Sequence, residues 1–200
     1  MVVSIVCLLK DDHSLLLRLY MLDDKLLLWK FKRGSADALE KIYAKYERYL
    51  ITVATGLLNN THAAEDVLGD FFVSFVQSAD TVKLDGNLKS YMARCVANLA
   101  RNRIKRKQLE PGALDDDISI ESEVSSPELL AMQEEETEML NRALSQLPYE
   151  QREVVVLHLQ GSMKFTQIAK LRGTSVNTIR SRYRYGLEKL RSLLSSEVIQ

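Results

Sequence analysis

Apolar residues recur every three or four positions through most of this chain, and this spacing constrains the fold more than any other feature. One series consists of Leu39, Ile42, Tyr46, Leu50, Val53 and Leu57, and a later one of Ile179, Tyr183, Leu187, Leu190 and Leu194. Such spacing places apolar side chains along one face of an α-helix. No segment alternates like a half-buried strand, and the 200 residues include only 8 glycines and 3 prolines. We therefore expect an all-α protein.

The charges of the chain are balanced overall but unevenly placed. Lys plus Arg and Asp plus Glu each total 27, yet residues 109–141 hold 11 acidic and no basic side chains. Residues 1–108 carry 17 basic against 12 acidic side chains, and residues 142–200 carry 10 against 4. This order favours two small basic helical domains that bind a polyanion, although charge runs are also typical of solvated faces. We expect domains over residues 22–107 and 127–196, joined by an acidic flexible linker over residues 108–126.

The start of the chain and its cysteines narrow the setting. Met21 opens a segment that reads like a natural start, so we expect residues 1–21 to be a dispensable extension. No apolar run is long enough to cross a membrane, and no signal peptide is recognisable. Cys7 and Cys95 lie far apart, and the three histidines lack metal-binding spacing. The sequence therefore predicts no membrane insertion, no metal, no cofactor and a reducing, cytoplasmic location.

Cap and turn residues divide the first domain into helices. Ser35 suits the N-cap of one helix, Asn59 and Asn60 favour a turn, and Thr61 can cap the next helix. The apolar stripe of that next helix consists of Ala64, Val67, Leu68, Phe71, Phe75 and Val76, whereas its acidic residues line a different side. A further helix is expected from near Leu88, and it ends in a basic tail that reaches Lys107.

The second domain has the layout of a helix-turn-helix. Pro148 fits the start of one helix, Gly161 ends it, and two further helices meet at a short turn around Gly173. Ser175 is a suitable N-cap for the last helix. Polar side chains on one stripe of that helix are of types that bind base edges and phosphates in the major groove. The alternative is a basic surface helix of a generic bundle. We predict that DNA is contacted by Ser175, Asn177, Thr178, Arg180, Ser181 and Arg184.

Three motifs relate the two domains to a known family. The segment "AEDVLGDFF" is similar to "AEDVxQExF", and "LSQLPYEQREVVVLH" matches a Leu-Pro-x-x-x-Arg pattern through Leu147, Pro148 and Arg152. With "QIAKLRGTSVNTIRSR", these motifs resemble regions two and four of bacterial sigma-70 family sigma factors, in their short extracytoplasmic-function (ECF) form. Three positions depart from the family pattern, because glutamine, a Ser or Thr cap, and leucine are usual where this chain has Gly69, Lys164 and Arg172.

The resemblance implies a role for each domain. Glu65, Asp66 and Asp70 would lie on the face that binds core RNA polymerase, although acids near a helix N-terminus also complement the helix dipole. The second domain would read the minus-thirty-five element, and the first would read and melt the minus-ten element. The minus-ten candidates are Lys83, Asn87, Lys89, Tyr91, Arg94, Arg101, Arg103, Lys105 and Arg106. Of these, Tyr91 fits a core ring equally well, and the last four also fit a solvated helix end.

The sequence thus predicts a sigma factor that binds core RNA polymerase and directs promoter-specific initiation without itself being an enzyme. Core polymerase and promoter DNA are the expected partners, and an anti-sigma factor is left open as a third. The alternative is a stand-alone helix-turn-helix regulator with a helical sensor or dimerisation domain, which the acidic and basic-tailed helices of the first domain argue against. A DNA-acting enzyme has less support, since no metal cluster, nucleophile–base set or phosphate-binding glycine loop is recognisable.

Overall fold

The computed structural model describes residues 23–82, 87–109 and 137–197, and all regular structure within them is helical, as predicted. The first bundle contains a helical segment over 23–32, α2 (Ala36–Leu58), α3 (Thr61–Gln77), the short 3₁₀ turn η1 (Ala79–Thr81) and α4 (Leu88–Leu109). The second contains a helical segment over 137–145, α6 (Tyr149–Leu159), α7 (Phe165–Arg172) and α8 (Val176–Glu197). The extension over 1–21 and most of the expected linker lie outside the described residues. Within them, no helix combines the length and apolarity that crossing a membrane requires.

The first bundle closes around side chains that its helices point inward. Ile42, Tyr46 and Leu50 of α2 are almost fully buried, together with Phe75 of α3 and Met92 of α4. The segment 23–32 is fixed to this core from outside. The Tyr46 hydroxyl donates to the Asp24 carboxylate at 2.7 Å, and the rings of Phe31 and Phe75 stack with centroids 4.6 Å apart. Because a buried carboxylate needs such partners, this segment belongs to the folded bundle.

The predicted helix boundaries are confirmed with two corrections. The Ser35 hydroxyl accepts a hydrogen bond from the Ala38 amide, and Asn59 ends α2 in a left-handed conformation with φ of 51°. The cap of α3, however, is Asn60 and not Thr61, because the Asn60 side-chain oxygen accepts from the Ala63 amide at 2.7 Å. The assignment of Val76 to the buried stripe is also wrong, since Val76 is 46% exposed at the outer side of α3.

The second bundle is a helix-turn-helix supported by α6. Leu157, Ile168 and Ile179 meet in its centre with no exposed surface. The His158 ring stacks on Phe165 at 4.1 Å and hydrogen bonds through Nδ1 to the Met163 carbonyl, which holds the entry to α7 against α6. The turn between α7 and α8 depends on Gly173, whose φ of 60° favours a residue without a side chain.

Two sequence-predicted caps of this bundle can be followed in the structure. The Ser175 hydroxyl accepts from the Thr178 amide at 3.0 Å, which confirms it as the cap of α8. Lys164 occupies the N-cap position of α7, where the family usually has Ser or Thr. The Gln167 side chain accepts a hydrogen bond from the Lys164 amide at 2.8 Å, which is the second half of a capping box. The unusual residue therefore leaves α7 with one of its two usual end contacts.

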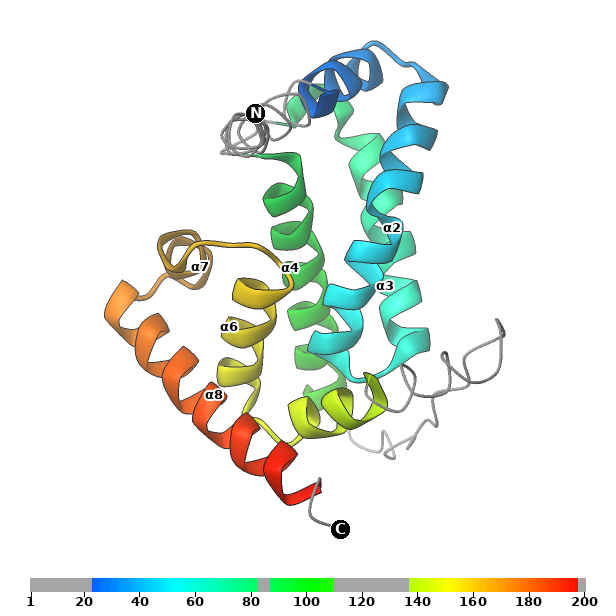
Figure 1. Cartoon of the computed structure of the whole chain (residues 1–200). Coiled ribbons are helices and arrows are strands. Elements are labelled where there is room, and N and C mark those ends of the chain that lie inside the picture. The colour runs from blue at the N-terminus through cyan, green and yellow to red at the C-terminus, as the bar shows by residue number, and fades with distance from the viewer. Residues whose placement is uncertain (1–22, 83–86, 110–136, 198–200) are drawn as a thin grey trace, which may run out of the picture.

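The two bundles pack against each other through α6, which lies beside α4 and contacts both α4 and α2 (Figure 1). The Tyr49 hydroxyl on α2 donates to the Gly161 carbonyl at 3.0 Å, across 112 positions of the chain. Burial raises the pKa of this phenol above its usual range, so the hydroxyl keeps its proton as a donor. The described residues therefore form one closed molecule, in which the two domains share an interface.

Candidate nucleic-acid and protein interfaces

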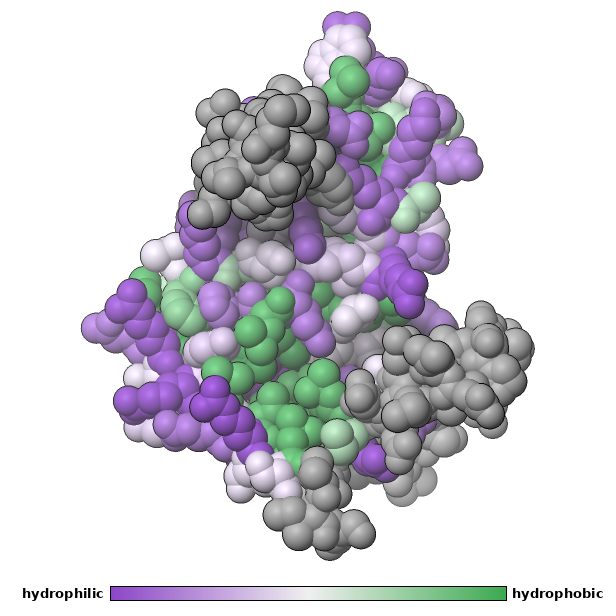
Figure 2. All heavy atoms as spheres, in the orientation of Figure 1, coloured by the Kyte–Doolittle hydropathy of each residue, from purple (hydrophilic) through white to green (hydrophobic). Residues whose placement is uncertain are grey.

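The N-terminal half of α8 presents a polar stripe to solvent. Asn177, Arg180, Ser181 and Arg184 are all exposed, while Ile179 on the opposite side is buried and fixes the helix on the bundle. Figure 2 shows that the edge of the molecule formed by α8 is mostly hydrophilic. The structure therefore brings these four predicted DNA-binding residues together on one accessible face, beside the turn that a helix-turn-helix places against the duplex.

The remaining two candidates on α8 have a structural task as well. The Ser175 and Thr178 hydroxyls lie 2.9 Å apart, and the Ser175 oxygen also caps the helix. Arg182 differs from its neighbours because it forms an ion pair with Glu150 of α6 within the second bundle. Arg184, by contrast, has only the exposed Glu188 at 4.0 Å and the Tyr185 ring beneath its guanidinium at 4.8 Å. Arg180 and Arg184 are therefore the arginines of this stripe that a duplex can reach.

The acidic candidates lie on the outer face of α3. Glu65, Asp66 and Asp70 are exposed, whereas Val67, Leu68 and Phe71 point into the core. Asp66 also pairs with Arg103 of α4 at 2.8 Å, and both side chains remain substantially exposed. The sequence assigned these two residues to different partners, polymerase for Asp66 and DNA for Arg103. The structure brings them together as one exposed ion pair.

An apolar groove next to the acidic face was missed by the sequence analysis. It has a volume of about 580 Å³ between α2 and α3, and its walls include Leu39, Tyr43, Phe72, Val73 and Val76. The rings of Tyr43 and Phe72 pack at 4.7 Å, so Phe72 is a wall of this groove rather than a core residue as the sequence suggested. Val73 is 59% exposed. An apolar residue outside the buried stripe was the signal in the sequence that could have indicated this surface.

The minus-ten candidates on α4 separate into two sides of the helix. Tyr91, Arg94, Arg101 and Lys105 recur every three or four residues and share one face, whereas Arg103 lies on another and pairs with Asp66. Lys105 and Arg106 are exposed near the end of α4. Lys83 lies outside the described residues. The structure therefore assembles only part of the predicted set into one stripe.

The candidates at the start of α4 have contacts of their own. The Asn87 side-chain oxygen accepts from the Ser90 amide at 2.7 Å and so caps α4. The Lys89 ammonium lies 4.4 Å from the centre of the Tyr49 ring. Tyr91 is half-buried, and burial raises the pKa of its hydroxyl to about 12, so the ring stays neutral near pH 7. With Arg94 beside it at 5.4 Å, this ring presents an uncharged aromatic surface next to a cation.

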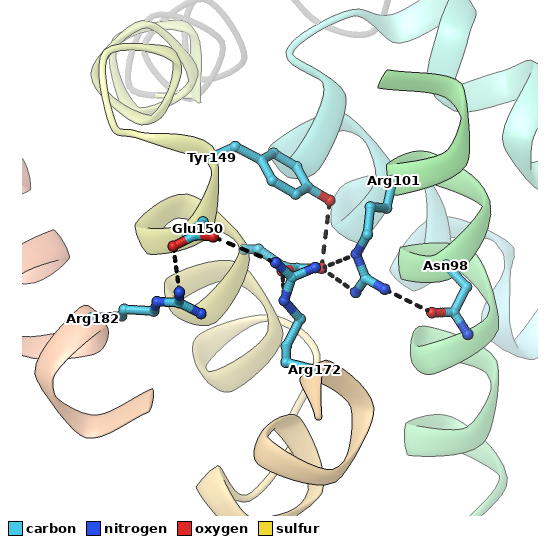
Figure 3. Close-up of polar contacts among 7 residues, drawn as sticks. Asn98, Arg101, Tyr149, Glu150, Arg172 and Arg182 are labelled. Atoms are coloured by element: carbon cyan, nitrogen blue, oxygen red, sulfur yellow. Dashed lines mark hydrogen bonds and ion pairs between the residues drawn. The ribbon is translucent and has the colours of Figure 1, made fainter. Parts of the chain in front are cut away.

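Arg101 forms part of a buried ion cluster (Figure 3). Glu153 of α6 has no exposed surface, and one of its oxygens accepts from Arg101 Nε at 3.2 Å and Nη2 at 2.5 Å. Its other oxygen lies 3.1 Å from Arg172 Nε, and Arg172 also reaches Glu150 at 3.8 Å. Thus Arg172, which departs from the family pattern, neutralises a carboxylate that would otherwise be buried without sufficient charge.

No cluster of His, Cys, Asp and Glu side chains suited to a metal ion occurs among residues 23–82, 87–109 and 137–197. Cys95 is a free thiol, half-buried beside Tyr91, and burial raises its pKa. The residues assembled here are therefore those of recognition surfaces: a polar stripe on α8, a cationic stripe on α4, and an acidic face with an apolar groove on α3.

Comparison with known proteins relates these surfaces to a family. Residues 42–110 match the family model "Sigma-70 region 2", and residues 137–190 match "Sigma-70, region 4". The chain is similar to the RNA polymerase sigma factor CarQ of Myxococcus xanthus, with 27% identity over 168 residues, which cover 82% of this chain and 94% of CarQ. It is also similar to the ECF RNA polymerase sigma factor SigW of Bacillus subtilis, with 24% identity over 82% of this chain and 92% of SigW.

Two solved structures share the fold. CnrH, solved with the cytosolic domain of CnrY, superposes with a TM-score of 0.61 and 20% identity, covering 87% of this chain and 98% of that chain. The sigma factor RpoE of Bartonella quintana, solved with the anti-sigma factor NepR, superposes with a TM-score of 0.60 and 22% identity, covering 78% and 96%. The arrangement of helices described above is therefore one that sigma factors adopt.

Proposed function

The chain belongs to the sigma-70 family as an ECF sigma factor that directs promoter-specific transcription initiation, and on this premise we propose which of its surfaces hold polymerase and promoter DNA. The first domain, over 22–107, holds core polymerase and reads and melts the minus-ten element. The second, over 127–196, reads the minus-thirty-five element, and the acidic linker joins them. The observation that carries the proposal is the presence in one molecule of an exposed acidic face on α3 and an exposed polar stripe on a recognition helix.

For core polymerase, we propose the outer face of α3. Glu65, Asp66 and Asp70 supply carboxylates that steer and orient a basic partner. The neighbouring groove, with Tyr43 and Val73 in its walls, supplies apolar area that a charged patch alone lacks. A partner with arginines beside apolar side chains fits this combination, because the ionic contacts select it and the apolar contacts hold it.

For promoter DNA, we propose one surface on each domain. Arg180, Arg184 and Asn177 of α8 reach base edges in the major groove of the upstream element, and Ser181 reaches phosphate. On α4, Tyr91 offers a ring on which an unstacked base can lie, and Arg94, Arg101 and Lys105 follow the backbone. Asn87, Lys89 and Arg106 flank this stripe.

The same proposal covers what the protein lacks and where it acts. The reaction centre belongs to the polymerase, and this chain contributes binding energy for recognition and strand opening rather than bond chemistry. It works in the cytoplasm, where the polymerase and promoters are. Because the two solved structures with this fold carry CnrY and the anti-sigma factor NepR, an anti-sigma factor is a further partner that we propose for this chain.

Binding to purified core polymerase without DNA tests the polymerase surface. Asp66→Lys combined with Asp70→Lys should weaken binding by at least tenfold, since like charges would face a basic partner. Asp37→Lys is the control, because Asp37 is an exposed carboxylate in the first turn of α2, outside the proposed surface. Equal affinity of the double variant and the control would remove α3 from the interface. A wild-type chain that fails to bind core polymerase would favour a stand-alone regulator.

The ion pair between Asp66 and Arg103 requires its own control. Exchanging the two residues, as Asp66→Arg with Arg103→Asp, keeps an attractive pair while removing the carboxylate from α3. If polymerase reads the carboxylate at position 66, the exchanged variant stays weak in the binding assay although its fold is intact by circular dichroism. Recovery of wild-type affinity would mean that the pair matters only for holding α3 and α4 together.

A further inference from the structure

The second domain lies on the side of α4 that carries its cationic stripe. Tyr91, Arg94 and Asn98 of α4 share a cavity of about 330 Å³ with Gln167, Lys170 and Leu171 of α7. One helical turn further along, Arg101 is bound by Glu153 of α6. These side chains recur along a single face of α4. A nucleic-acid strand that follows this face would meet α6 and α7 in its path.

The contact between the domains is shaped at a glycine in the middle of α2. A side chain at Gly56 would meet Gln160 Oε1 at 2.9 Å and Val156 Cγ2 at 3.2 Å, so its absence lets α6 approach α2. The three nearest atoms all come from the second domain, so a larger residue here leaves the core of the first bundle untouched. The Tyr49 hydroxyl adds its hydrogen bond to Gly161 on the same side of α2. Gly56 and Tyr49 thus form a seat for the end of α6.

The Arg101–Glu153 pair is the charged part of the same contact (Figure 3). Glu153 keeps Arg172, from its own domain, when the domains separate, so its carboxylate is not abandoned. Arg101 then loses its carboxylate partner and becomes available to phosphate. The buried Gln160 side-chain oxygen has no hydrogen-bond partner among the described residues and would regain water on separation. These contacts make the closed arrangement specific while leaving a route for it to open.

Promoter geometry requires that route to be used. Elements centred about 25 base pairs apart, as the names minus-ten and minus-thirty-five state, lie about 85 Å apart along B-form DNA. With α6 and α7 seated on α4, the stripes of α4 and α8 cannot reach two sites so far apart at once. Residues 110–136, which join the domains, can span at most about 90 Å when fully extended. The chain is therefore long enough to bridge the two elements, but only after the domains part.

We infer that the closed arrangement is an autoinhibited state, in which the second domain covers the minus-ten stripe of α4 through the Gly56–Tyr49 seat and the Arg101–Glu153 pair. Free protein keeps this stripe from binding nucleic acid. Phosphates compete with Glu153 for Arg101 as the domains separate on the polymerase. The covering of a DNA-binding surface rests on the function proposed for α4, whereas the closure of the two domains does not.

Distances between spin labels in the free protein test the closure. Labels at Ser74→Cys and Ser192→Cys, on exposed positions of α3 and α8, report the separation of the domains once Cys7 and Cys95 are replaced by alanine. The parent protein should give one short, narrow distance. Gly56→Leu should shift most molecules to a longer and broader distribution, and Tyr49→Phe should shift fewer. Gly69→Leu is the matched control, since nothing lies within 4 Å of a side chain at that mid-helix glycine.

Binding of a labelled single-stranded oligonucleotide of mixed sequence then tests the covering. If only the open form binds, the apparent dissociation constant of Gly56→Leu falls by the factor by which its open fraction rises. A parent protein that is already open, or distances that Gly56→Leu leaves unchanged, would overturn the closure without affecting the proposed function. Opening without any gain in affinity would overturn the covering and count against α4 as a DNA-binding surface.

Discussion

At the residue scale, the arginines of this protein divide into those that hold the fold and those that face solvent. Arg172 and Arg182 bind the carboxylates of α6, and Arg101 reaches the same cluster from the other domain. Arg180 and Arg184 lie two residues to either side of Arg182 and face outward. The helical repeat alone separates these roles, because residues two apart lie on different sides of a helix. Only the outward pair is free to distinguish one base sequence from another.

This division predicts the effect of three substitutions on DNA binding. Arg180→Ala and Arg184→Ala should each weaken binding to the upstream element by about 1–3 kcal/mol if each makes a base-specific contact, and should reduce the preference for that sequence. Arg182→Ala should instead change stability, because it leaves Glu150 without its partner in α8. Fluorescence anisotropy with matched and scrambled duplexes checks both. Unchanged sequence preference in the first two variants would mean that another face of α8 reads the bases.

Arg172 provides a separate prediction about stability. Arg172→Leu restores the residue that is usual in the family but removes a charge from the fully buried Glu153, and breaking such a pair costs about 3–5 kcal/mol. Arg172→Leu combined with Glu153→Leu should recover much of this loss, since no unpaired charge remains. Urea denaturation of the single and double variants measures the coupling. Additive losses would show that the two side chains act independently.

At the element scale, α3 has three distinct faces within 17 residues. Its inner face builds the core, the outer face of its N-terminal half carries the acids, and the outer face of its C-terminal half forms one wall of the groove. A glycine in the middle of this helix, Gly69, touches none of the neighbouring elements. Because Gly69 lies between the acids and Val73, the outer face of α3 is continuous across it.

Replacing this glycine should strengthen the helix. Gly69→Ala should raise the free energy of unfolding by about 1 kcal/mol, since alanine restricts the unfolded chain and a side chain there meets no neighbour. Thermal denaturation of the free protein followed by circular dichroism measures the change. A destabilised variant would indicate that α3 is distorted at this point or that the glycine is needed for another conformation.

The helices were predictable from the sequence because they depend on local signals. Apolar spacing located α2, α3, α4 and α8, and Ser35 and Ser175 cap the helices for which they were predicted. Where two neighbours could both cap, as with Asn60 and Thr61, the pattern could not decide between them. The position of Val76 was misjudged because apolar residues also line an exposed groove. The contact between the domains could not be predicted, since it joins residues more than 50 positions apart, such as Arg101 and Glu153.

At the scale of the whole molecule, the surfaces have different accessibility. The acidic face of α3 and the polar stripe of α8 are open to solvent, whereas the stripe of α4 adjoins the second domain. Core polymerase can therefore bind α3 before any change in the arrangement of the domains. The upstream element can likewise reach α8 in the closed molecule. Melting of the minus-ten element comes last in this order, because it requires α4 to be uncovered.

The most direct test of the account is to map transcription start sites in vitro, with purified core polymerase, this chain and a library of genomic promoter fragments. We predict starts that occur only when the chain is added and whose upstream DNA shares two elements, about 25 base pairs apart, roughly two and a half turns of B-form DNA. Arg180→Ala with Arg184→Ala should reduce initiation at these starts. The absence of chain-dependent starts, or starts that share only an upstream element, would contradict the account.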